Sequence, residues 1–242
     1  MGIRKAGMIA AVGLIVASSF AGYTARAAIH PSVAEHLDNA RIQAQLGKAD
    51  EAASYAQAML MGGKITVSVD YGNTPIKQIP ECDEAIKGAF DMWETALNHE
   101  VSFSKVEFGQ PADVKIKFDQ NTKLKNQIVS GYINWSRTVE DTTDGPIPHF
   151  KADVFLRTTD PSGTPMHAKA MRHTCGHEFG HMFGLDDVKE VGMLMGPINV
   201  RCPVAAPCES EIETVKAIRS ECQTLVLAAK HAGKSGEQFD TQ

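Results

Sequence analysis

The sequence of 242 residues has little cysteine, no basic run and only one strongly apolar stretch, which lies at the N-terminus. Five cysteines are too few for a small fold held together by disulfides. Acidic residues (29) outnumber basic ones (24), which argues against nucleic acid or an anionic membrane surface as the main partner. With 43% hydrophobic and 22% charged residues, the composition is that of a globular protein with one or two domains.

Residues 1–27 have the three-part organisation of a secretory signal peptide. Arg4-Lys5 gives a basic start, residues 8–20 are apolar, and Ala25-Arg26-Ala27 is a small-residue cleavage site. As a helix, the apolar stretch would span about 20 Å, less than a bilayer core of about 30 Å. We therefore expect cleavage after Ala27 and a secreted or periplasmic protein without an integral membrane span.

Residues 28–63 predict a helical hairpin. Pro31-Ser32 followed by Glu35 forms a capping-box start, and the helical pattern runs to Gly47 before resuming at Asp50. This hairpin is either a prosegment that is removed or an accessory element of the mature protein.

Residues 64–230 predict one α+β domain with a twisted mixed sheet of about five strands and three helices. Thr164-Pro165 indicates the start of the second helix, and Ser210 with Glu213 the start of the last. Residues 231–242 are expected to form a disordered tail. The strand patterns cover 65–69, 101–108, 114–118, 131–135 and 152–157, and the helical patterns begin near 86, 164 and 210.

The chemistry is concentrated in the sequence HEFGHMFGLDD, residues 177–187. On a helix, His177 and His181 lie about 40° apart and face one point, as two ligands of one metal ion must. Glu178 is close enough to touch a metal-activated water without being a ligand. Gly184 allows a left-handed turn that brings Asp187 back toward the same point. Three protein ligands with a fourth position open are typical of catalytic zinc.

This pattern resembles the metzincin superfamily of zinc endopeptidases, whose signature HExxHxxGxxH or HExxHxxGxxD is followed by a methionine turn. Matched residue by residue, His177, His181 and Asp187 correspond to the metal ligands, Glu178 to the general base and Met195 to the methionine of the turn. The spacing to Met195 and the order of strands and helices from Lys64 to Lys230 look most like the matrixin branch.

The resemblance implies a metzincin fold, a catalytic Zn²⁺ and hydrolysis of peptide bonds in protein or peptide substrates. It implies that the substrate lies extended along an edge strand, for which 131–135 is the candidate. It also implies that residues 196–200 wall the pocket for the residue after the cleaved bond, and Pro197 and Ile198 indicate an apolar preference there.

The sequence departs from the matrixin pattern in two ways that matter for function. The third ligand is Asp187 instead of histidine, a variant similar to snapalysin-type enzymes. A cysteine-switch prosegment is missing, because Cys82 is the only cysteine before the catalytic helix and lies inside the domain.

Two other functional interpretations remain open from the sequence. One is a non-catalytic zinc-containing protein that uses the helical hairpin to dock a partner, although the intact Glu178 favours an enzyme. The other is a zincin in which Glu209 or Glu213 on a later helix replaces Asp187 as the third ligand.

Several polar residues outside the motif have both a functional and a structural interpretation. His173 is expected to be a surface or capping residue rather than a partner of the metal ligands. A loop with Glu140, Asp141 and Asp144 is either a solvated acidic loop or a site for Ca²⁺. Cys202 and Cys208 form the easiest local disulfide. Cys175 is the expected free thiol.

Overall fold

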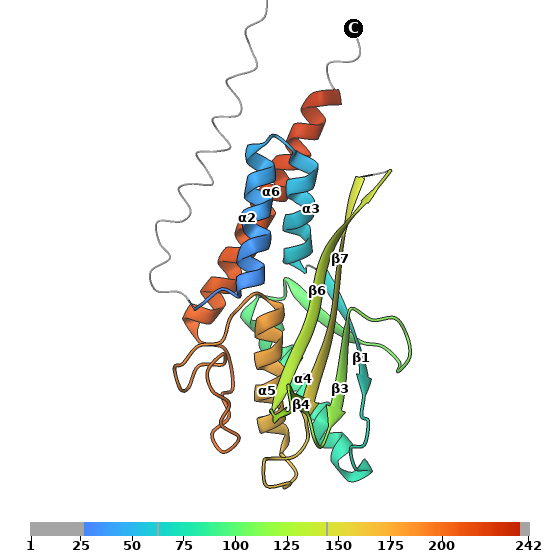
Figure 1. Cartoon of the computed structure of the whole chain (residues 1–242), viewed down its shortest axis with the longest axis vertical. Coiled ribbons are helices and arrows are strands. Elements are labelled where there is room, and N and C mark those ends of the chain that lie inside the picture. The colour runs from blue at the N-terminus through green and yellow to red at the C-terminus, as the bar shows by residue number, and fades with distance from the viewer. Residues whose placement is uncertain (1–26, 62, 144, 238–242) are drawn as a thin grey trace, which may run out of the picture.

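The computed structural model describes residues 27–61, 63–143 and 145–237. The predicted signal peptide, except Ala27, lies outside these residues. The chain has two parts stacked along the long axis of the molecule (Figure 1). A sheet with two helices forms one part, and a layer of three helices, with a long β-ribbon rising beside it, forms the other.

One sheet of five strands, in the order β2-β1-β3-β7-β6, carries the first part. The strands β1, β2, β3 and β7 run parallel, while β6 pairs antiparallel with β7 and lies at an edge. In β3, buried and exposed residues alternate, as expected for a sheet with one covered face. The strands are β1 (Gly63–Asp70), β2 (Val101–Lys105), β3 (Val114–Asp119), β6 (Gly131–Thr142) and β7 (Gly145–Arg157); β4 (Lys123–Leu124) and β5 (Gln127–Ile128) form a separate small hairpin.

Two helices, α4 (Ile79–Ala96) and α5 (Ala168–Met182), pack together and cover this face. A short 3₁₀ helix, Ile76–Gln78, precedes α4. The side chains of Phe90, Phe103 and Phe179 stack between the two helices and β2. The predicted α+β fold with a mixed sheet of five strands is confirmed.

Helix α5 begins later than the sequence indicates, so Thr164-Pro165 was a wrong start signal. Pro165 instead forms a β-bridge with Thr159, and the Met166 amide donates to the Thr158 carbonyl (2.8 Å). These bonds keep the chain extended until His167, whose ring accepts from the Ala170 amide and caps the helix.

The hairpin residues form α2 (Pro31–Gln45) and α3 (Ala49–Leu60), which pack against α6 (Glu209–Glu237). Arg41 of α2 makes two hydrogen bonds, 2.6 and 3.0 Å long, to the Glu221 carboxylate of α6. The hairpin therefore shares a hydrophobic core with the last helix of the domain. That core contains Val33, Leu37, Ala40, Ala56, Met59, Ile218, Cys222, Leu225 and Val226.

The ends of α6 also differ from the predicted pattern. The box at its start is formed by Glu211 and not by Glu213, since the Glu211 carboxylate accepts from the Cys208 amide (2.7 Å). The helix continues to Glu237, into the segment expected to be disordered, and residues 238–242 lie outside the described part. No helix in the described part of the chain has the length and apolar character of a membrane span.

Candidate metal centre

Helix α5 carries both histidines of the motif and is fixed from behind by α4. The Trp93 indole N–H of α4 donates to the Gly176 carbonyl (2.8 Å), next to the first histidine. Gly176 and Gly180 on the facing side leave room for Met92 and Met195, respectively. The helix is therefore held at a fixed depth beneath the cleft.

The two histidines are oriented by backbone carbonyls. His177 donates from Nδ1 to the Leu194 carbonyl (2.8 Å), and His181 donates from Nδ1 to the Leu185 carbonyl (2.9 Å). Each Nδ1 therefore carries the proton, and each Nε2 keeps its lone pair for a metal. The ring centroids lie 4.9 Å apart.

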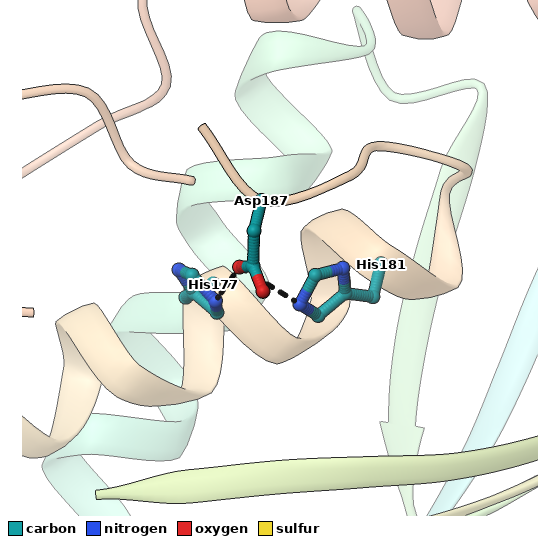
Figure 2. Close-up of side chains that lie close together, drawn as sticks. All are labelled: His177, His181 and Asp187. Carbon is teal, nitrogen blue, oxygen red and sulfur yellow. Dashed lines mark ion pairs between the residues drawn. The ribbon is translucent and has the colours of Figure 1, made fainter. Parts of the chain in front are cut away.

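Asp187 joins the two histidines because the chain reverses direction at Gly184. Gly184 has φ +103°, in the left-handed region that favours glycine. The Asp187 Oδ1 atom lies 3.1 Å from Nε2 of His177 and 3.5 Å from Nε2 of His181 (Figure 2). One donor atom from each of the three residues lies within 4.8 Å of the others. In the part of the chain that the structure describes, this is the one cluster of three or more such side chains that could hold a metal ion.

The charges of this cluster change the pKa values of its members. Hydrogen bonds that the protonated histidine rings donate to Asp187 lower the pKa of its carboxyl, and the bond from His177 has a larger effect than the bond from His181. Burial would lower the pKa of His181, but the hydrogen bond that its protonated ring donates to the Asp187 carboxylate and the charge of Glu178 outweigh burial and raise that pKa. The carboxylate thus attracts positive charge to the position that a cation would occupy.

Glu178 is buried beside the cluster but borders the cleft. Its side chain is 3% exposed, and burial raises the pKa of its carboxyl while the charges of His177 and His181 partly offset this rise. Gly131, the first residue of β6, lets the edge strand approach: an added Cβ would lie 2.6 Å from Thr174 Cγ2 and 3.1 Å from Glu178 Oε1. Glu178 therefore lies between the cluster and the edge strand.

Met195 is completely buried beneath the cluster, at the position expected for the methionine of the turn. Its amide donates to the Glu211 carboxylate (2.8 Å), and the Leu194 amide donates to the same carboxylate (3.4 Å). Glu211 thus ties the turn to the start of α6. This role of Glu211 was not predicted from the sequence, which indicated Glu213 as the capping residue of a helix beginning at Ser210.

A cleft of about 440 Å³ opens above these residues. It contains His177, Glu178 and Asp187 and is bounded on one side by the start of β6 and on the other by the chain after Met195. The remaining lining residues are Val129, Ser130, Gly131, Val188, Met195, Gly196, Pro197 and Ile198.

Other residues singled out from the sequence lie elsewhere or have other partners. His173 was expected to be a surface or capping residue, but it is buried, with 1% of the residue exposed. Its ring accepts a hydrogen bond from the Val204 amide (3.1 Å) and lies near the Leu194 carbonyl (3.4 Å). Neither Glu209 nor Glu213 joins the histidines in the described cluster. Glu140 and Asp141, which were expected in a loop, belong to strand β6, and Glu140 pairs with His149 of β7 (3.0 Å). The Asp141 side chain and the whole of Asp144 lie outside the described part, so the calcium site stays a prediction.

The predicted Cys202–Cys208 disulfide is absent: all five cysteines lie in the described part, and all five are free. The Cys208 thiol contacts the Ser210 hydroxyl (3.2 Å) instead. Cys175 is a free, buried thiol, as expected.

The residues just before α2 were not predicted to be neighbours of the site. Ile29 forms an antiparallel bridge with Leu185, and the ring of His30 contacts those of His181 and Trp135, with centroids 6.1 and 5.3 Å apart. Arg137 of β6 donates to the Met182 carbonyl at the end of α5. Residue types alone give no signal for these contacts.

A helix with HExxH, a glycine turn that brings Asp187 to the two histidines and a buried methionine nearby form the sequence and structural pattern of the metzincin family of zinc metallopeptidases. The sequence model of the matrixin family matches residues 61–206, which is more than half of the chain. The chain belongs to the matrixin family, as the sequence motif indicated. A comparison with curated proteins finds no match.

Among solved structures, the chain is similar to an archaemetzincin from Methanopyrus kandleri. The two share 11% sequence identity with a TM-score of 0.43, and the alignment covers 65% of this chain and 96% of the other.

Proposed function

We propose that the protein is an exported zinc-dependent endopeptidase that hydrolyses peptide bonds in protein substrates. The observation that carries this proposal is the arrangement of three metal-ligand atoms within 4.8 Å of one another beside a buried glutamate that borders an open cleft. Membership of a zinc metallopeptidase family supports it, and so does the mixed imidazole and carboxylate donor set, which suits zinc.

His177, His181 and Asp187 would hold the metal through the two Nε2 atoms and Oδ1. The set fits because both Nδ1 atoms are already engaged by carbonyls, so that only Nε2 is available on each ring. When bound there, Zn²⁺ polarises the scissile carbonyl and lowers the pKa of a water molecule toward about 7. The buried Met195 supports the ligands from below and is assigned no chemical step.

Glu178 is the proposed general base. It would accept the proton of the attacking water at its carboxylate and then deliver it to the nitrogen of the leaving amine. Its burial raises its pKa, which suits a group that must both take up and release a proton. Gly131 keeps β6 close to this carboxyl without steric conflict.

Strand β6 lies at the edge of the sheet and pairs there with β7 on one side. An extended substrate would pair with the backbone of β6 on its other side. The side chain after the cleaved bond would enter the cleft between β6 and the chain at Gly196, Pro197 and Ile198. The apolar character of the last two residues indicates a preference for an apolar side chain. A peptide library with each residue type at that position tests this preference.

Export rests on the predicted signal peptide. We expect the mature N-terminus at Ala28 and a secreted or periplasmic location. Sequencing the N-terminus of protein recovered from outside the cytoplasm tests both statements.

The decisive experiment compares the wild type with Glu178→Gln and with Glu107→Gln, an exposed glutamate remote from the cleft. Loss of the general base should lower kcat by about 10²–10⁴-fold with zinc still bound, whereas Glu107→Gln should match the wild type. A zinc-loaded wild type that cleaves no peptide in a broad library would favour the alternative, a zinc-containing binding protein. Normal turnover by zinc-loaded Glu178→Gln would disprove the assigned role.

A further inference from the structure

The first residues of the described chain form a two-stranded contact with the loop that carries the third metal ligand. The His30 amide donates to the Gly184 carbonyl (2.9 Å), and the Asp186 amide donates to the Ala28 carbonyl (2.8 Å). Ile29 and Leu185 are paired between them. Residues 28–30 therefore bind the backbone on both sides of Leu185.

Leu185 connects this pairing to the metal ligands. Its carbonyl accepts from His181 Nδ1 (2.9 Å), and its side chain is completely buried. Asp186, which the Ala28 carbonyl holds, directly precedes Asp187. A displacement of this loop would therefore move the Asp187 carboxylate and the partner that orients His181 together.

The hairpin anchors residues 28–30 to the rest of the domain. Val33 packs against Gly184, where an added Cβ would lie 3.1 Å from Val33 Cγ1. Leu37 is 2% exposed in the core shared with α6, and Arg41 binds Glu221 of that helix. His36 Nε2 also lies 3.4 Å from the Arg137 carbonyl of β6.

The hairpin does not occupy the cleft. All residues that line the cleft follow residue 128 in the chain, so removal of the hairpin would not uncover it. A segment that blocks an active site has to lie in it, and this one lies behind the ligands.

We propose that residues 28–60 are a permanent part of the mature enzyme and that the backbone of residues 28–30 positions the metal-ligand loop. This inference rests on the proposed function for its metal, and it excludes the prosegment interpretation of the hairpin. His30 is a positioning residue that acts through Gly184 and His181.

The test uses two substitutions at His30 in the full-length mature protein. His30→Ala removes the ring contacts and keeps the backbone N–H, while His30→Pro removes the N–H as well. Proline fits this position, since His30 has φ −57° and ψ 132°. The difference between the two variants therefore isolates the hydrogen bond to Gly184.

The main readout is zinc affinity, measured by competition with a chelator. We expect His30→Pro to bind zinc about tenfold more weakly than His30→Ala. At saturating zinc, kcat should fall more than KM rises, because the ligand loop and not the substrate edge is displaced. Intact mass should show that the active wild-type species retains residues 28–60.

Equal zinc affinities for the two variants would overturn the positioning role. Recovery of an active species that begins near residue 64 would overturn the retention of the hairpin. If His30→Pro does not fold, hydrogen exchange in the zinc-free wild type decides: a protected Asp186 amide supports the pairing, and rapid exchange refutes it. A wild type without zinc binding or activity would instead refute the proposed function.

Discussion

Gly180→Ala tests whether the packing of Met195 beneath helix α5 supports the metal centre. Gly180 lies on α5 directly before His181, and an added Cβ would overlap the Met195 sulfur and lie 3.1 Å from its Cε. Met195 is completely buried, so its sulfur can move only if the side chain or the turn that carries it changes conformation. We expect the variant to displace the methionine turn and, with it, the Leu194 carbonyl that orients His177.

The magnitude follows from two opposing effects. Overpacking a buried position costs about 1–3 kcal/mol, and replacing glycine by alanine within a helix returns about 1 kcal/mol. We therefore expect a net loss of about 1 kcal/mol of unfolding free energy, together with weaker zinc binding. Urea unfolding of the zinc-free protein and chelator competition measure the two quantities.

Gly176→Ala, one turn earlier on α5, is the matched control. Its Cβ would lie 2.8 Å from the sulfur of Met92, which is 8% exposed and belongs to α4, outside the metal centre. We expect little change in zinc affinity there. In a Met195→Ala background the overlap disappears, so Gly180→Ala should become stabilising by about 1 kcal/mol. If Gly180→Ala has the same sign and size in both backgrounds, the packing argument is refuted.

Three further predictions concern the thiols, the hairpin and the third ligand. Alkylation of the native protein near pH 8 should modify only Cys202 and Cys208, because the other thiols are buried and burial raises the pKa of Cys82 to about 12; mass spectrometry that detects a third adduct before unfolding would contradict this. Leu37→Ala should lower the free energy of unfolding of the whole domain by about 2–4 kcal/mol, and tryptophan fluorescence should show a single unfolding transition. A separate unfolding transition of the hairpin would refute the shared core. Asp187→His should move the acidic limb of the rate profile to lower pH. In the wild type the Asp187 carboxylate raises the pKa of His181, so protons compete with zinc for this ring up to a higher pH than in the variant. The negative charge of Asp187 also reduces the positive charge that the zinc site would exert on the attacking water. An acidic limb at the same or higher pH in the variant would count against this reasoning.

The motif on α5 could be recognised from sequence because helical periodicity is local. The positions of His177, Glu178 and His181 relative to one another follow from the turn of one helix, and Gly184 marks its end. The return of Asp187 needed only one more assumption, that the left-handed glycine reverses the chain.

The partners that orient these ligands could not be predicted, because they are backbone carbonyls. Any residue could supply the oxygen atoms of Leu185 and Leu194, so residue types carry no information about them. The predicted start of α5 was wrong for a related reason. Pro165 fits the first turn of a helix by its local preference, but its β-bridge with Thr159 keeps the backbone extended at this position. Long-range pairing outweighed local preference at this position.

The role of the hairpin was left open because the contacts between its own two helices do not complete the burial of its apolar positions. Val33 and Leu37 complete their burial against α6, more than 170 residues further along the chain. Sequence periodicity finds such a face but does not identify what covers it.

The packing of α6 against α2 and α3 also sets the order in which the molecule can be completed. Glu211, which fixes the backbone of Leu194 and Met195, belongs to α6 and is synthesised after the motif on α5. A nascent chain that already contains HEFGHMFGLDD still lacks the residues beneath its candidate metal centre and the surface against which α2 and α3 pack. Contacts between such distant segments form late in folding, so a partly synthesised chain lacks a complete candidate metal centre.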